Sequence, residues 1–92
     1  MKVTVHYLAQ LRRAAKLAAE EVELEAPATL ANVLALLVQR HGDELRRMLL
    51  DDAGSLRSGL LVFVNDEQAV HPEQIFLKDG DSITFLSPIA GG

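Results

Sequence analysis

The chain has 92 residues, enough for one domain with a single hydrophobic core, and 49% of them are apolar, which excludes a disordered linker protein. The formal net charge of −4 argues against nucleic acid as a direct partner. The sequence has no cysteine, which excludes disulfides, and no long apolar segment typical of a signal peptide or membrane span, so we expect a cytoplasmic protein.

The opening segment predicts a strand followed by a short helix. Residues 2–8 alternate between apolar and polar side chains, as in a strand with one buried face. Residues 9–19 are rich in alanine and leucine, which favours a helix. We expect Leu8, Leu11 and Ala15 to line the inner side of this helical segment.

The next segment predicts a strand with an acidic face. Residues 20–26 alternate, so that Glu21, Glu23 and Glu25 share one side. Three glutamates on one strand face require water, and this face of the sheet is therefore expected to be open.

Two helices are predicted in the middle of the chain. Apolar side chains recur at helical spacing through residues 30–41 and form one wide stripe. Thr29 is suited to cap the beginning of this main helix, and Gly42 is suited to follow its end. Residues 43–49 place acidic side chains before basic ones, which favours a second short helix.

Strands and turns dominate the second half. Residues 60–64 are apolar on both faces, so this strand is either covered on both sides or docks a partner on one side. Asn65 and Asp66 favour a tight turn after it. Residues 75–77 predict a short strand fragment, and residues 82–86 predict the last strand.

Together these elements predict an α+β fold with two layers. A mixed sheet of four to five strands packs on one main helix, and the order of elements fits a ubiquitin-like β-grasp. Residues 1–86 would form this domain, and residues 87–92 would form an extended C-terminal tail.

The domain itself offers little chemistry. The histidines at positions 6, 41 and 71 lack metal-ligand spacing, and we interpret them as surface residues. The sequence shows no nucleophile motif or phosphate loop, so we expect no enzyme and no metal site. A set of basic side chains either meets an acidic partner or is simply solvated: Arg12, Arg13, Lys16, Arg46 and Arg47.

The strand at residues 60–64 supplies a candidate docking surface. Leu61 and Phe63 share one side of this strand and are candidates for the solvent-facing side of the sheet. Exposed apolar groups rimmed by charge are typical of a binding surface. The alternative is that the short helices bury both sides.

The chain ends on a short segment without charged side chains. Pro88 cannot donate to a sheet ladder, so the last strand is expected to stop before it. Gly91 and Gly92 leave room for the close approach of another backbone. Six extended residues span about 20 Å, enough to place the carboxylate of Gly92 in a partner's active site. A frayed terminus of small residues is the alternative.

Three fragments, in this order, resemble the MoaD/ThiS family of ubiquitin-like sulfur carriers. The first is the apolar strand Gly59-Leu60-Leu61-Val62-Phe63-Val64-Asn65-Asp66. The second is the turn Lys78-Asp79-Gly80-Asp81, and the third is the ending Pro88-Ile89-Ala90-Gly91-Gly92. The resemblance covers most of the chain.

The resemblance implies a carrier that binds no cofactor of its own. A ubiquitin-activating-type adenylyltransferase would use ATP to adenylate Gly92, and a sulfur nucleophile would then convert it to a thiocarboxylate. Adenylation is needed because a carboxylate is a poor electrophile without a good leaving group. The residues that would thread into the partner are Pro88, Ile89, Ala90 and Gly91.

The ending is most similar to that of the small subunit of molybdopterin synthase, which implies the large subunit of that enzyme, or another sulfur-accepting enzyme, as a partner. The strand at residues 59–66 also resembles the ubiquitin-related modifier and carriers for tRNA thiolation, thiamine or cysteine synthesis. Lys16 departs from the family pattern, because many members have glycine there.

Overall fold

The computed structural model describes residues 1–87 of the chain. Its helices and strands follow in this order: β1 (Lys2–Tyr7), α1 (Gln10–Ala15), β2 (Ala19–Glu23), β3 (Ala28–Thr29), α2 (Leu30–His41), α3 (Asp43–Leu49), β4 (Leu61–Val64), β5 (Glu67–Gln68), the 3₁₀-helix η1 (Pro72–Gln74), β6 (Phe76–Leu77) and β7 (Ser82–Leu86).

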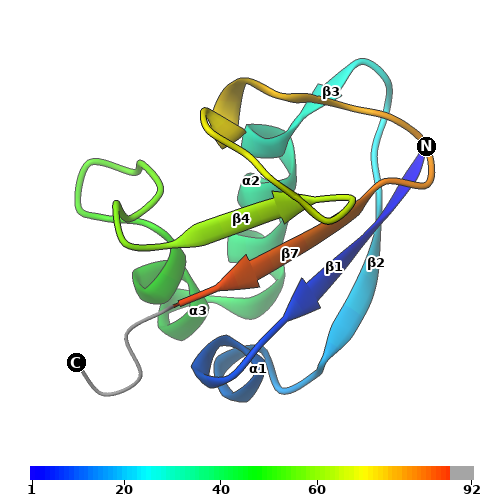
Figure 1. The fold of residues 1–92 in the computed structure, drawn as a ribbon. Helices are drawn as coiled ribbons and strands as arrows, with labels where there is room; N and C mark the ends of the chain where they lie inside the picture. Colours follow the sequence, from blue (N-terminus) through cyan, green and yellow to red (C-terminus); the bar gives the residue numbers. More distant parts are fainter. Residues whose placement is uncertain (88–92) are drawn as a thin grey trace.

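The main sheet has five strands in the order β2-β1-β7-β4-β5. The first and last strands of the chain, β1 and β7, lie parallel at its centre, and all other neighbours in the sheet are antiparallel. A separate two-stranded sheet joins β3 to β6. Figure 1 shows the helices on one side of the main sheet. The predicted α+β, ubiquitin-like β-grasp arrangement is therefore confirmed.

The core lies between the sheet and the helices. The stripe of α2 is buried at Leu30, Val33, Leu34 and Leu37, because helical spacing keeps these side chains on one side. They pack with the inward side chains of β1 and β7, among them Tyr7 and Phe85, whose rings stack with centroids 6.5 Å apart.

Turn residues set the element ends as predicted. The Asn32 side chain accepts a hydrogen bond from the backbone N–H of Thr29 at 2.8 Å, which fixes the start of α2. Gly42 ends α2 with φ at +84°, a conformation in which a side chain would be strained. Asn65 and Asp66 both adopt positive φ and connect β4 to β5 as a two-residue hairpin turn.

One prediction about the first helix is wrong. Leu11 and Ala15 are buried as expected, but Leu8 is 42% exposed. Leu8 continues the alternation of β1 rather than the spacing of α1, because Ala9, with φ at +52°, separates the two elements. Leu8 therefore lies on the same side as His6, away from the core.

The backbone conformation of Lys16 is one to which glycine is better suited than lysine. This residue ends α1 in the left-handed conformation, with φ at +66° and its N–H bonded to the carbonyl of Arg12 at 2.9 Å. A left-handed residue after a helix is the usual place for glycine.

Across residues 1–87, the model contains no helix with the length and apolar character that a bilayer crossing requires.

Candidate functional site

The predicted sulfur-carrying residue Gly92 and the threading residues Pro88, Ile89, Ala90 and Gly91 lie outside the described part of the chain. The structure does describe where the tail begins. β7 ends at Leu86, and Ser87 follows it. Since β7 is the central strand beside β1, the tail leaves from the middle of the sheet's end and not from its edge.

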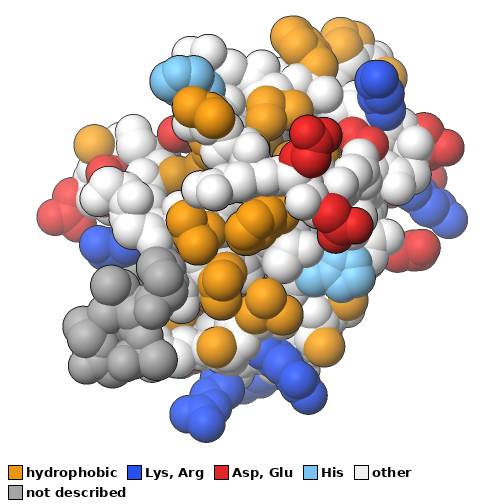
Figure 2. Space-filling view, in the orientation of Figure 1, with side chains coloured by type: hydrophobic (Ala, Val, Ile, Leu, Met, Phe, Trp, Pro, Cys, Tyr) orange, Lys and Arg blue, Asp and Glu red, His pale blue; other side chains and the backbone are white. Residues whose placement is uncertain are grey.

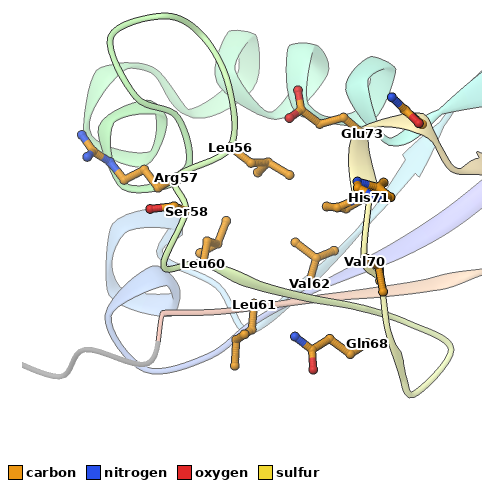
Figure 3. A pocket seen from close by; sticks show the side chains of 13 residues that line it. Leu56, Arg57, Ser58, Leu60, Leu61, Val62, Gln68, Val70, His71 and Glu73 are labelled. Atoms are coloured by element: carbon orange, nitrogen blue, oxygen red, sulfur yellow. The ribbon is translucent and has the colours of Figure 1, made fainter.

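Leu61 and Phe63 lie on the open face of the sheet. Both are half-buried, whereas Val62 between them is only 2% exposed and belongs to the core. Figure 3 shows Leu61 and Val62 projecting from opposite sides of β4. The alternative in which helices bury both sides of this strand therefore does not apply, since the helices cover only the Val62 side.

Strand pairing extends this apolar surface beyond the two predicted residues. Leu86 of β7 lies opposite Leu61, and Thr84 lies opposite Phe63. Leu8 continues the same side of β1. We name Leu8, Leu61, Phe63 and Leu86 the sheet-face patch; Figure 2 shows apolar side chains gathered over these strands. Leu8 and Leu86 were missed, although the alternation of the strands that contain them would have identified both.

Charged side chains share the open face of the sheet with the sheet-face patch. Glu21 and Glu23 of β2 lie opposite Thr4 and Lys2 of β1, on the same open side. This confirms that the acidic side of β2 faces solvent, although β2 ends at Glu23 and Glu25 follows it. An apolar surface with a charged rim, next to the origin of the tail, is typical of a protein-docking site.

Two grooves open around the segment that precedes β4. The larger, of about 480 Å³, lies between residues 56–62 and residues 68–74 (Figure 3). Its charged or titratable lining residues Arg57, His71 and Glu73 are all exposed, so it lacks the buried polar groups that would fix a small ligand. The smaller groove, of about 330 Å³, is lined by Leu56, Leu60 and Ser87 among others, and so borders the start of the tail.

A partly buried polar network lies on the other side of the sheet. Glu20 accepts hydrogen bonds from the Tyr7 hydroxyl at 2.6 Å, from Arg40 at 2.8 Å and from His41. The His41 side chain is 13% exposed, so our interpretation of it as a surface residue is wrong. Strand alternation could have predicted this network. Glu20 lies two residues before Val22 and therefore shares the side of β2 that faces the helices.

The network perturbs two titratable groups without creating a reactive one. Burial, together with the hydrogen bond to Glu20, raises the pKa of Tyr7 well above its ordinary value. Burial alone would raise the pKa of Glu20, but hydrogen bonds from Tyr7, Arg40 and His41 outweigh it and lower that pKa. A phenol that keeps its proton and a carboxylate that stays ionised hold the helix end to the sheet, which is a structural role.

Residues 1–87 contain no cluster of three histidine, cysteine, aspartate or glutamate side chains placed to hold a metal ion. His6 lies on the open sheet face and His71 is exposed on a loop, far apart in the fold.

The model of the ThiS family matches residues 5–92, which is nearly the whole chain. No curated protein sequence matches it. Among solved structures, SAMP1 from Haloferax volcanii is 26% identical, with full coverage of both chains and a TM-score of 0.87. Urm1 from Trypanosoma brucei is 30% identical over 99% of this chain and 95% of its own, with a TM-score of 0.81.

A third similar structure is a putative molybdopterin converting factor, subunit 1, from Pyrococcus furiosus. It is 26% identical over 97% of this chain and 99% of its own, with a TM-score of 0.73. Since the family match covers the β-grasp domain and runs through the terminal diglycine, the chain belongs to the ThiS family of ubiquitin-like sulfur carriers.

Proposed function

We propose that this chain carries sulfur on the C-terminal carboxyl group of Gly92 and acts with partner enzymes rather than as an enzyme itself. The observation that carries the proposal is a diglycine ending that follows the central strand β7 of a β-grasp domain, within a family match that extends to residue 92. Residues 1–87 contain no cysteine and no cluster of three metal-ligating side chains.

The chemistry follows from the carboxylate. An adenylyltransferase of the ubiquitin-activating type joins the Gly92 carboxylate to AMP from ATP and releases pyrophosphate. Sulfide then attacks the activated carbonyl carbon, AMP leaves, and a terminal thiocarboxylate remains. ATP is consumed on the partner, so the chain needs no bound cofactor. A cytoplasmic location is part of this proposal, because ATP is a substrate of the activation.

The domain's role is to present the tail. Five residues beyond Ser87 reach at most about 17 Å, so the partner must dock close to the end of β7. The sheet-face patch lies beside that end and offers the apolar area for docking. In this arrangement Pro88, Ile89, Ala90 and Gly91 enter the partner's channel while Leu61 and Phe63 remain at its surface.

ATP–pyrophosphate exchange tests the activation step. Purified ubiquitin-activating-type adenylyltransferases from the same organism are mixed with ATP, labelled pyrophosphate and the chain. One of them should exchange label only in the presence of the chain, and deletion of Gly92 should abolish this exchange. Exchange that persists without Gly92 would show that its carboxylate is not the acceptor of AMP.

We propose molybdopterin synthase as the acceptor system, with this chain as its small subunit. The ending Pro88-Ile89-Ala90-Gly91-Gly92 and the similarity to the Pyrococcus furiosus converting factor support this choice. Thiocarboxylated chain should then convert a pterin precursor when it is mixed with the large subunit of the synthase, and chain with an ordinary carboxylate should not.

A second candidate function is attachment to other proteins. It is favoured by the similarity to SAMP1, whose name in a related structure is small archaeal modifier protein 1, and to Urm1. In that case Gly92 would form amide bonds with lysine side chains. Denaturing gels of native cells, probed for this chain, should show a ladder that disappears when Gly92 is deleted.

A further inference from the structure

Charge is distributed unevenly over this acidic protein. Residues 8–18 and 42–60 contain six of the nine lysines and arginines but only four of the thirteen aspartates and glutamates. The remainder of the chain contains three basic and nine acidic residues. In Figure 2 some of the Lys and Arg side chains lie below the central apolar side chains, where no Asp or Glu side chain is visible.

Both basic segments flank the place where the tail begins. Tyr7 pairs with Phe85, so the chain that leads from β1 into α1 lies beside the end of β7. On the other flank, the groove of about 330 Å³ is lined by both Arg57 and Ser87. The end of β7 therefore lies between the arginines of α1 and those near β4.

Arg57 is held in a fixed orientation at this site. Its Nε donates a hydrogen bond to the backbone carbonyl of Arg47, which leaves the two terminal amino groups available. Figure 3 shows the guanidinium pointing away from the other residues that line the larger groove, and Arg57 is exposed. Within residues 1–87 it makes no ion pair, whereas Arg40 and Arg46 pair with Glu20 and Asp43. A guanidinium already oriented by one hydrogen bond is suited to bind a carboxylate through two parallel hydrogen bonds.

We propose that Arg57, together with Arg12, Arg13 and Arg47, forms a cationic docking surface around the exit of the tail that binds an acidic rim on the adenylyltransferase. We name these four residues the exit arginines; all are exposed and lack ion-pair partners within residues 1–87. The inference rests on the proposed function. A tail of about 17 Å reaching into an active site brings the exit arginines to the mouth of the partner's channel, not to the reacting atoms.

A protein surface fits the exit arginines better than a nucleic acid does. The net charge is −4, and the acidic remainder of the domain would repel a long phosphate backbone. Arg12 and Arg13 follow Leu8 of the sheet-face patch closely in sequence, and Arg57 lines the same groove as Ser87, which follows Leu86. An apolar centre with a charged rim is the usual anatomy of a protein interface.

The test compares two charge reversals with the same net charge. Arg57→Glu changes the proposed surface, and the control Lys78→Glu changes an exposed lysine just before the opposite end of β7. Pyrophosphate release by the adenylyltransferase is measured against the concentration of each variant. For Arg57→Glu we expect KM for the chain to rise about tenfold or more with kcat unchanged, because rim charges act on association. Lys78→Glu should stay within about twofold of wild type.

Arg57→Lys separates charge from geometry. This variant keeps the positive charge but cannot donate two parallel hydrogen bonds to one carboxylate. Its KM should therefore lie between the KM of wild type and that of Arg57→Glu. Wild-type KM should also rise with salt, whereas that of Arg57→Glu should rise much less. Equal urea midpoints for Arg57→Glu and Lys78→Glu would establish that both domains are comparably folded.

The possible failures are distinguishable. If wild type supports no pyrophosphate release, the proposed function fails and the docking surface with it. If wild type is active and Arg57→Glu behaves like Lys78→Glu, only the docking surface is wrong. If Arg57→Glu keeps its KM but abolishes retardation of total tRNA in a gel shift, the exit arginines serve a nucleic acid and the proposal is overturned.

Discussion

At the scale of single residues, Lys16 occupies a conformation that its side chain does not favour. Its φ of +66° ends α1, and the following turn leads into β2. A left-handed conformation costs roughly 1–2 kcal/mol for a residue with a Cβ atom, and the surrounding packing has to offset it. The departure from the family's glycine is therefore a matter of stability and leaves the fold unchanged.

Lys16→Gly should raise the free energy of unfolding by about 0.5–1 kcal/mol, because relief of the left-handed strain exceeds the entropy that glycine adds to the unfolded chain. Urea denaturation measures the change. Lys16→Ala is the matched control, since it removes the same charge but retains a Cβ, and it should bring no such gain. Equal midpoints for the two variants would contradict the strain.

Glu20 is the second residue whose role is set by its immediate surroundings. It ties Tyr7 of β1 to Arg40 and His41 at the end of α2. Since its pKa is lower in the folded state, the unfolded chain binds this proton more tightly. The stabilisation is complete above the ordinary carboxyl pKa of about 4.3 and is lost as the pH falls through the lower folded value.

Glu20→Gln should cost about 1–3 kcal/mol at pH 7, because three donors lose a charged acceptor. Its stability should then change less than that of wild type as the pH falls below about 5. Thermal or urea unfolding across this range provides the measurement. Glu25→Gln, at an exposed position, should cost less than about 0.5 kcal/mol; a comparable loss there would mean that bulk charge explains the effect.

At the scale of elements, the two sides of β4 have different surroundings. Val62 is 2% exposed within the core, while its neighbours Leu61 and Phe63 lie on the sheet-face patch. The strand is apolar throughout because one side stabilises the domain and the other, in our proposal, contacts a partner.

Phe63→Asp should leave the domain folded, at a cost of about 1–2 kcal/mol, and should weaken binding of the adenylyltransferase. Val62→Asp is the contrasting variant: an unpaired charge in the core should unfold the domain. Circular dichroism and titration calorimetry measure the two effects. A folded Phe63→Asp variant that binds with wild-type affinity would remove Phe63 from the docking surface.

The elements themselves were largely predictable. The periods of two and 3.6 residues located β1, β2 and α2, because each has one side in the core, and a continuous apolar run located β4. The two-residue strands β3 and β6 were not fully predicted, since two residues carry no period; their pairing depends on tertiary packing. The alternation of β7 was enough to place Leu86 on the open face, but that it lies opposite Leu61 depends on strand pairing, which the sequence does not show.

At the scale of the whole molecule, the domain positions the start of the C-terminal segment, which in our proposal carries the reactive carboxyl group. The principal extents are 36 × 25 × 25 Å, and β7 leads from the centre of the sheet toward the tail. The sheet-face patch and the exit arginines lie beside this exit, so apolar contact and charge attraction would act on the same partner. The role proposed for the tail depends on resemblance, because these six uncharged residues carry no periodic pattern of their own.

The central claim is that Gly92 carries sulfur, and intact-mass spectrometry tests it most directly. The chain is incubated with its adenylyltransferase, ATP and sulfide, and the variant without Gly92 serves as the control. We predict a gain equal to the difference between one sulfur and one oxygen atom, located at the C-terminus by fragmentation and absent in the control. An unchanged mass, with an enzyme that demonstrably adenylates the chain, would contradict the account.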